Sequence, residues 1–548
     1  MWDAHSVVGV SFGLVLFVIF FAGSFALYRV GLAQWADPVL RGQPVLTTDE
    51  IVGPLFDERP PEAGSDVTVV YPFGERRSLF LIYSPTGETT DEGDPVRAVL
   101  TYSTTTGEEV APGGQSRLSL ILYQLHFLLQ LRHILPGDAL IGIAIAGILG
   151  VYLLFAIITG LLIHLKKLPR EWHTFRPRER LRTAVADAHT VLGLVGLPFA
   201  VAFAFTGAVI AIMIMLRPQI EAQFFEGDAD AYHEAIYGSV APEADSTGQA
   251  AAMLLPDQLA SVLPAGWEGI DPIRVVYSRW GDEGATATLY GHTAETLTEV
   301  GEATLLAASG EVLVHNPPST PTALGATYSA VEQLHYADVG GWPLDALFFL
   351  LAMATAAVML TGNMLWVLVR RPKDLRATPW LHHLLARLTA GLGVGLIAAT
   401  PVLFLLAQLL PADYADRKLW EEAGFFIAWA VFAVTALVGP SAISASRWHL
   451  RMAAILCLAV PIANGVMTGG WLWVAVTSGW WATFWIDVGF LIAAPLLWWT
   501  AARLPSETAP PARPVDRGDL RITASPLPAP VSASVATPSP RPASVQPL

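Results

Sequence analysis

The chain has 548 residues, of which 53% are hydrophobic and only 14% are charged. A soluble globular protein carries about a quarter charged residues, so this composition excludes a soluble protein and indicates a membrane protein. The single cysteine, Cys457, excludes an intramolecular disulfide, a Cys-based zinc site, an iron–sulfur cluster and a CxxCH haem attachment.

Eight segments are long and apolar enough to cross a bilayer, which takes about 20 mostly apolar residues. In chain order they cover about 6–28, 139–165, 189–214, 343–369, 385–410, 424–443, 450–475 and 480–502. No cleavage site follows the first segment, so we interpret it as a retained helix and not as a signal peptide. The pattern predicts a polytopic α-helical membrane protein with about eight transmembrane helices.

The charges of the two signs are segregated along the chain. Basic residues crowd the loop between the second and third helices and follow the fourth helix: Lys166, Lys167, Arg170, Arg176, Arg178, Arg180, Arg182, Arg370, Arg371, Lys373 and Arg376. Basic short loops stay in the cytoplasm, whereas the long acidic segments 31–137 and 214–340 fall on the opposite side. We therefore expect a multi-pass protein of the bacterial inner membrane, with both termini in the cytoplasm and the large loops in the periplasm.

An internal repeat organises the first two thirds of the chain. The segment Asp3–Gly9 recurs as Asp187–Gly193, each at the expected start of a helix. Three shorter matches accompany it: Thr106-Gly107-Glu108 with Ser309-Gly310-Glu311, Gln124-Leu125-His126 with Gln333-Leu334-His335, and Thr159-Gly160 with Thr361-Gly362. Because each copy holds an even number of spans, we expect the copies to be parallel and related by an axis along the membrane normal.

The repeated unit is predicted to be a helix, a periplasmic α+β domain, a Gln-Leu-His segment and a second helix. The predicted domains are a first repeat 1–168 with its periplasmic domain at about 31–117, a basic cytoplasmic loop 169–186, a second repeat 187–372 with its periplasmic domain at about 215–330, a four-helix membrane extension 378–503, and a tail 504–548. The tail is rich in Pro, Ala and Ser, so we expect it to be disordered.

Six of the thirteen histidines are placed at two membrane depths by the repeat. His5, His164 and His189 are expected at the cytoplasmic face, and His126, His133 and His335 at the periplasmic face. Imidazole is a common axial ligand of haem iron. We therefore predict two b-type haems with two histidine ligands each: His5 with His189, and His126 or His133 with His335. His164 is an alternative partner of His189.

The same residues also have simpler structural interpretations. A histidine near a membrane interface is often only a polar anchor, Asp3 and Asp187 suit N-caps, and Thr-Gly pairs near helix ends are commonly packing contacts. Joint placement at two depths favours the ligand interpretation, because ionisable groups are costly there. The other histidines are expected to be solvated: His173, His233, His292, His315, His382, His383 and His449.

Several of these segments resemble the PepSY-associated transmembrane family. The resemblance rests on the run Gly160–Lys167, on Thr174-Phe175-Arg176-Pro177, Asp187-Ala188-His189, Leu197-Pro198-Phe199 and Thr206-Gly207, and on Leu334-His335-Tyr336 followed by Gly340–Leu344. It covers roughly residues 1–372. It implies PepSY-like periplasmic domains and an iron-regulated membrane protein similar to haem-containing ferrisiderophore reductases.

The expected function is then reduction of a ferric siderophore, or another ferric chelate, to release Fe(II) in the periplasm. No GxGxxG signature follows a strand, so the electron donor is expected to be external, a quinol or a cytoplasmic reductase. Besides the donor and the chelate we expect the lipid bilayer as a partner, and no nucleic acid. Two alternatives are a transporter for a siderophore or another small solute, and a non-catalytic PepSY binding or assembly partner in the envelope.

Overall fold

A computed structural model describes most of the chain up to Pro505. The described residues are 2–72, 78–89, 96–110, 115–128, 130–131, 140–166, 173–238, 240, 242, 246–293, 300–319, 321–337, 341–370 and 379–505. The tail from Ser506 onward, which is predicted to be disordered, lies outside them.

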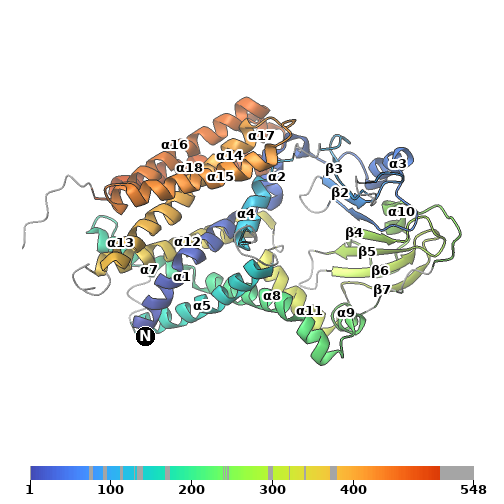
Figure 1. Ribbon diagram of the computed structural model, residues 1–548, viewed down its shortest axis with the longest axis horizontal. Helices are drawn as coiled ribbons and strands as arrows, with labels where there is room; N and C mark the ends of the chain where they lie inside the picture. Colours follow the sequence, from blue (N-terminus) through green and yellow to red (C-terminus); the bar gives the residue numbers. More distant parts are fainter. Residues whose placement is uncertain are drawn as a thin grey trace, which may run out of the picture. The chain divides into compact units, whose positions relative to one another are not determined.

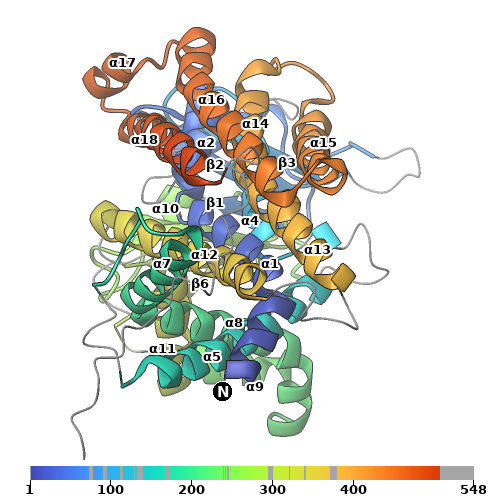
Figure 2. The ribbon, with the colours of Figure 1, turned by 90° about the vertical axis from the view of Figure 1, so that its left-hand side faces the viewer.

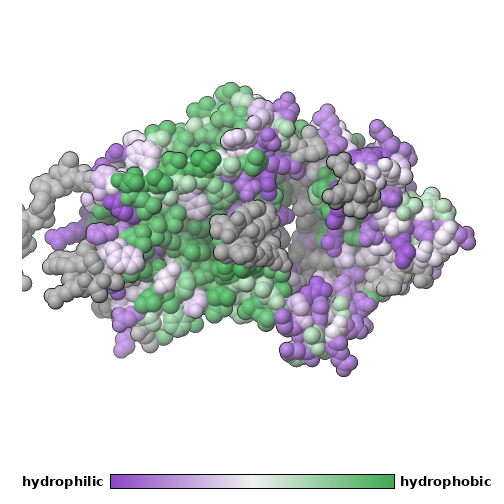
Figure 3. Space-filling view, in the orientation of Figure 1, coloured by the Kyte–Doolittle hydropathy of each residue, from purple (hydrophilic) through white to green (hydrophobic). Residues whose placement is uncertain are grey.

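The chain is a multi-pass membrane protein. Among the described residues, eight helical segments are long and apolar enough to span a bilayer, as predicted. They are α1 (Trp2–Ala26), α5 (Leu140–His164), α8 (Leu197–Phe224), α12 (Gly341–Val369), the segment Trp380–Leu409, α15 (Arg417–Val438), α16 (Ala442–Thr468) and α18 (Trp481–Arg503). Figure 3 shows hydrophobic side chains over the long helices and hydrophilic ones over the strands.

Two predicted helix bounds are wrong for identifiable reasons. The third span was expected to begin at His189, but the chain forms a separate helix, α7 (Leu181–Val195), before α8. Pro198 lies in the first turn of α8, and a proline cannot continue the hydrogen bonds of a preceding helix. The seventh span begins at Ala442 instead of near residue 450, because Ser441 accepts a hydrogen bond from the backbone N of Ser444 and caps the helix.

The spans of the two copies pack in a matched pattern. Helix α1 packs against α5 of its own copy and against α12 of the other, while α8 packs against α5 and α12. Small residues allow the closest approach: a Cβ on Gly147 of α5 would lie 2.5 Å from the Cβ of Ala211 on α8. Figure 2 shows these helices from the left-hand side of Figure 1.

The two large insertions form one antiparallel sheet. Its strand order is β3-β2-β1-β4-β5-β6-β7 (Figure 1). The strands are β1 (Val67–Val70), β2 (Ser78–Tyr83), β3 (Ala98–Ser103), β4 (Asp271–Ser278), β5 (Thr286–His292), β6 (Val300–Leu306) and β7 (Val312–Asn316). The first insertion supplies β1–β3 and the second β4–β7, and β1 joins β4 with Thr68 opposite Val276. One hydrophobic core contains buried residues from both insertions, so they fold together.

Two short helices strengthen this joint. Helix α3 (Thr48–Glu58) belongs to the first insertion and α10 (Pro256–Ser261) to the second. The backbone N of Asp49 donates to the Asp257 carboxylate at 2.9 Å, and the backbone N of Asp257 donates to that of Asp49 at 2.8 Å. Each helix start therefore also receives a hydrogen-bond acceptor from the other insertion.

The repeated turn sequence has the same geometry in both copies. Gly107 has a φ of 74° and donates its backbone N–H to the Ser103 carbonyl. Gly310 has a φ of 76° and donates to the Leu306 carbonyl. Glycine suits both positions because a positive φ is strained for other residues. The sequence repeat is thus also a structural one.

The C-terminal extension packs against the first copy and also contacts α12 of the second. It consists of α13 (Pro379–Leu388), a π-helical stretch (Thr389–Val394), α14 (Gly395–Leu409), α15, α16, the short α17 (Leu472–Thr477) and α18. Helix α2 (Arg29–Ala36), which follows α1, contacts α14 and α18. There the buried Trp35 donates its indole N–H to Asp487 at 2.8 Å, and Asn464 donates to the same carboxylate at 2.8 Å. Asp487 therefore has hydrogen-bonding partners inside the bundle.

Candidate functional site: two pairs of facing histidines

The structure brings together histidines from the two copies in two pairs. His5 on α1 lies beside His189 on α7, with ring centroids 6.2 Å apart and ring planes at 72°. His126 ends α4 (Leu118–His126), and His335 lies in the last turn of α11 (Ala323–Tyr336). Their ring centroids are 6.1 Å apart, and their planes differ by 24°. These pairs join the residues that the repeat relates to one another.

Each of the four imidazoles uses its Nδ1 atom in a hydrogen bond within its own copy. The Nδ1–H groups of His5 and His189 donate to the carbonyls of Ala156 and Val358, both at 2.9 Å. These carbonyls occupy equivalent positions, because each lies three residues before the repeated Thr-Gly pair. Metal-binding histidines commonly donate their second ring N–H to a carbonyl in this way, which leaves the lone pair of Nε2 free.

The second pair is held similarly, with one difference. His126 donates from Nδ1 to the Ile19 carbonyl at 2.8 Å. His335 instead has its Nδ1 3.0 Å from the Thr206 hydroxyl, which itself donates to the Ala202 carbonyl. Ala22 stands where the repeat places Thr206, so His126 bonds to a carbonyl directly. Burial lowers the pKa of both His126 and His335, which favours the neutral imidazole that binds metals.

A glycine faces each of these imidazoles. A Cβ atom would lie 3.0 Å from His5 at Gly160, 3.1 Å from His189 at Gly362, 2.9 Å from His335 at Gly207 and 2.6 Å from His126 at Gly23. Gly23 and Gly207 are equivalent in the repeat, as are Gly160 and Gly362. Only a residue without a side chain leaves room for the rings. The Thr-Gly pairs therefore contact the histidines and are not merely helix-packing positions.

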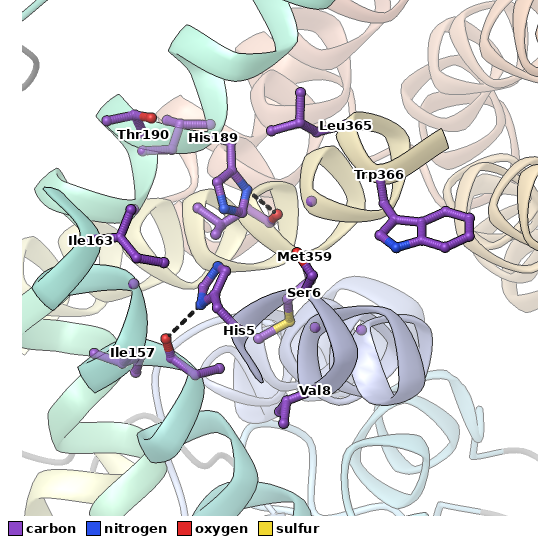
Figure 4. Close-up of a pocket in the computed structure, with 18 of the residues that line it drawn as sticks. His5, Ser6, Val8, Ile157, Ile163, His189, Thr190, Met359, Leu365 and Trp366 are labelled. Atoms are coloured by element: carbon purple, nitrogen blue, oxygen red, sulfur yellow. Dashed lines mark hydrogen bonds between the residues drawn. The ribbon is translucent and has the colours of Figure 1, made fainter. Parts of the chain in front are cut away.

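Two cavities are associated with the histidine pairs. The first, called the His5 cavity, has a volume of about 580 Å³ and a mostly apolar lining that includes His5, His189, Met359 and Leu365. Figure 4 shows its two imidazole rings pointing toward one another between helices of both copies. The second, called the His126 cavity, has a volume of about 120 Å³ and includes His126 and His335 in its lining. Leu16 lines both, so the two cavities are neighbours along α1.

Each pair supplies two imidazoles, the donors that a haem iron takes. A metal–imidazole bond is about 2.0 Å long and the ring centre lies roughly 1 Å beyond the nitrogen, so two imidazoles that bound one metal would have ring centres about 6 Å apart. Both observed separations match this spacing. In the described ranges no group of three or more His, Cys, Asp or Glu is placed to hold a metal ion. Two imidazoles suit a metal whose other ligands come from a macrocycle.

The remaining predicted ligands have different positions. His164 lines the His5 cavity, and its ring lies 6.3 Å from that of Trp2. The ring that faces His189 is that of His5. His133 lies outside the described residues. Asp187 is not an N-cap: it lies within α7 and forms a two-atom ion pair with Arg176.

The expectation that the other histidines are solvated is wrong for three of them. His292, His382 and His449 are buried, whereas His173, His315 and His383 are exposed. His449 lies 3.1 Å from the Ala390 carbonyl of the π-helical stretch, so helix packing covers it. Sequence reasoning also missed Gly23 and the carbonyl acceptors of His5, His126 and His189. Gly23 follows His5 in the sequence by the same number of residues as Gly207 follows His189. This match could have identified Gly23 as the equivalent of Gly207.

Two comparisons place the chain among known proteins. Residues 2–368 match the family described as PepSY-associated TM region. The uncharacterized protein PA4219 of Pseudomonas aeruginosa is 26% identical over 396 residues, which is 70% of this chain and 95% of that protein. All four paired histidines lie inside the family match, and the C-terminal extension lies beyond it.

Proposed function

The chain belongs to the family of PepSY-associated transmembrane proteins, and from this premise we propose that it carries electrons across the bacterial inner membrane. The observation that supports the proposal most is the pair of facing imidazoles at each of two levels, each ring with its Nδ1 already hydrogen-bonded. A b-type haem with two histidine ligands supplies a one-electron centre that has no open coordination position.

The protein residues hold and orient the two centres. His5 and His189 would bind one haem iron, and His126 and His335 the other. The backbone carbonyls and Thr206 fix the direction of the Nε2 atoms, and the four glycines leave space for the rings. These contacts hold the imidazoles in place, which suits a centre that exchanges electrons.

The distribution of charge supports the membrane orientation in this proposal. Arg176, Arg178, Arg180 and Arg182 precede or begin α7 near the level of the His5 cavity, and short basic loops stay in the cytoplasm. The His5 cavity would then face the cytoplasm, and the seven-stranded sheet would lie in the periplasm. A quinol or a cytoplasmic reductase would donate the electron.

The proposed substrate is a periplasmic ferric siderophore or another ferric chelate. One electron converts its Fe(III) to Fe(II), which oxygen-donor chelators bind more weakly, so the metal is released. The electron comes from the external donor, and no bond within the chelator has to break.

The reaction can be tested with the purified full chain. The protein is reduced with dithionite, freed of excess reductant and mixed with a ferric siderophore and a chromogenic Fe(II) chelator. We expect reoxidation of the protein with one Fe(II) trapped per electron lost. A protein that takes up electrons but is not reoxidised would rule out ferric-chelate reduction. The His335→Ala variant is the matched control, because it lacks the proposed centre on the periplasmic side.

A further inference from the structure

We propose that Glu421, in the C-terminal extension, positions His126 by capping the helix that carries it. The proposal rests on the proposed function, since it assigns a role to this residue in the haem site of the periplasmic side. It also gives a role to an extension that has no counterpart in the repeat.

Glu421 lies on α15 and contacts the start of α4. Its side chain is completely buried. One carboxylate oxygen accepts a hydrogen bond from the backbone N of Arg117 at 2.6 Å and another from the Ser116 hydroxyl at 3.1 Å. Because α4 begins at Leu118, these are donors at the helix N-terminus, where backbone N–H groups have no partner within the helix.

A second carboxylate supports the same helix start. Asp37, which follows α2, accepts from the backbone N of Ser116 at 3.0 Å. Arg417 lies beside both acids, at 3.4 Å from Asp37 and 3.0 Å from Glu421, and its side chain is 4% exposed. Breaking one member of such a buried charged group is costly, because it leaves an uncompensated charge in an apolar region.

The two copies differ at this point. The equivalent helix of the second copy, α11, is capped locally: Thr322 accepts from the backbone N of Gly325 at 2.9 Å. In α4 the N-cap residue Arg117 makes no side-chain cap. The start of α4 is held by its own copy through Ser116, which accepts from the backbone N of Leu118 at 3.2 Å, and through Asp37. Only for Arg117 N does it use a carboxylate of α15, whereas the cap of α11 comes from Thr322 of its own sequence.

A disturbance at Glu421 would reach His126 through a single rigid element. Helix α4 has nine residues, about 13 Å of helix, with His126 at its last position. Leu118, Ile121 and Leu122 are fully buried along it, and α4 packs against α1 and α2. These buried contacts hold α4 as one unit, so loss of the cap would shift or loosen the ligand at the far end.

The test uses three single variants of the full chain. Glu421→Ala removes the cap, Glu421→Gln keeps an oxygen that can accept from Arg117, and Glu422→Ala is the matched control. Glu422 is adjacent in sequence, but its carboxylate pairs with the side chain of Arg117 at 3.0 Å and not with the helix backbone. Each variant is made in the His189→Ala background, which retains the His126–His335 site, and in the His335→Ala background, which retains the other.

The readouts are the haem content, the midpoint potential and the low-temperature electron paramagnetic resonance spectrum. We expect Glu421→Ala to lose haem, or to shift its potential and spectrum, in the His189→Ala background only. In haem content, potential and spectrum, Glu421→Gln should be closer to the parent than Glu421→Ala is. Glu422→Ala should match the parent in all three. Unchanged spectra and potentials in Glu421→Ala, or equal changes in both backgrounds, would overturn the proposal. Absence of haem from the unmodified protein would instead refute the proposed function itself.

Discussion

His5 and His189 face each other with ring centroids 6.2 Å apart, although they come from different copies of the repeat. Each is held by a carbonyl of its own copy, Ala156 for His5 and Val358 for His189. The space between the rings is thus an interface between copies, and neither copy alone would form it. The same relation holds for His126 and His335. This duplication explains why one chain contains two similar sites.

The glycine facing His126 allows a direct test. A Cβ at Gly23 would lie 2.6 Å from the Nδ1 of His126, so Gly23→Ala should displace the ring and remove the haem of that site. The control is Gly489→Ala in α18, where nothing lies within 4 Å of the added carbon. Glycine to alanine in a helix favours the helix by up to about 1 kcal/mol, so the control should fold normally. The measurement is the haem content of the two purified variants. If both contain as much haem as the parent, Gly23 does not have this role.

The shared sheet can be tested by cross-linking. Thr68 on β1 and Val276 on β4 are paired residues, so cysteines at both positions should form a disulfide under mild oxidation. Thr288 lies one strand further, opposite Val276 on β5, which places it about 10 Å from β1. Thr68→Cys with Thr288→Cys is therefore the control and should stay reduced. Proteolysis between the two insertions followed by gel electrophoresis shows the link. If both pairs cross-link equally, β1 and β4 are not neighbours.

Asp282 should make one loop sensitive to acid. Its carboxylate accepts hydrogen bonds from the backbone N atoms of Thr247, Gly248 and Gly284. The bond from Thr247 contributes most to lowering the pKa of Asp282 below its ordinary value of 3.8. A lowered pKa means that the stabilisation is complete above about pH 4 and is lost as the pH falls below it. In the Asp282→Asn variant the backbone amides of residues 247–249 should therefore exchange hydrogen faster than in the parent at pH 7. The difference in exchange rate between variant and parent should narrow below pH 4. Hydrogen exchange with mass spectrometry measures this; a difference that does not depend on pH would contradict it.

The contact between α2 and the extension should contribute to stability. Asp487 accepts hydrogen bonds from Trp35 and Asn464 in a buried site. Asp487→Ala leaves both donors without that acceptor, at a cost of about 1–3 kcal/mol for each buried group. The melting temperature in detergent should fall clearly. Asp413→Ala removes an exposed acid from the loop before α15 and should leave it unchanged. Equal melting temperatures for the two variants would show that the Asp487 contact is not important for folding.

The membrane-spanning pattern was predictable from long apolar runs, and the pairing of the histidines from the repeat. Each span is a local signal, and the repeat relates His5 to His189 without any knowledge of packing. Pro198 was visible, but its effect on the start of α8 depends on how the chain enters the bilayer. The role of Glu421 was not predictable, because its partner Arg117 lies 304 residues away in sequence. Pairing of β1 with β4 likewise joins different insertions, and alternation of side chains does not specify which strands become neighbours.

Haem stoichiometry tests the central claim most directly. The full chain is produced with sufficient haem, purified, and its haem b measured per mole of protein together with the visible spectrum before and after dithionite. We predict two low-spin haems per chain, one in His189→Ala, one in His335→Ala and none when both changes are combined. A colourless protein, or single variants that keep both haems, would contradict the account.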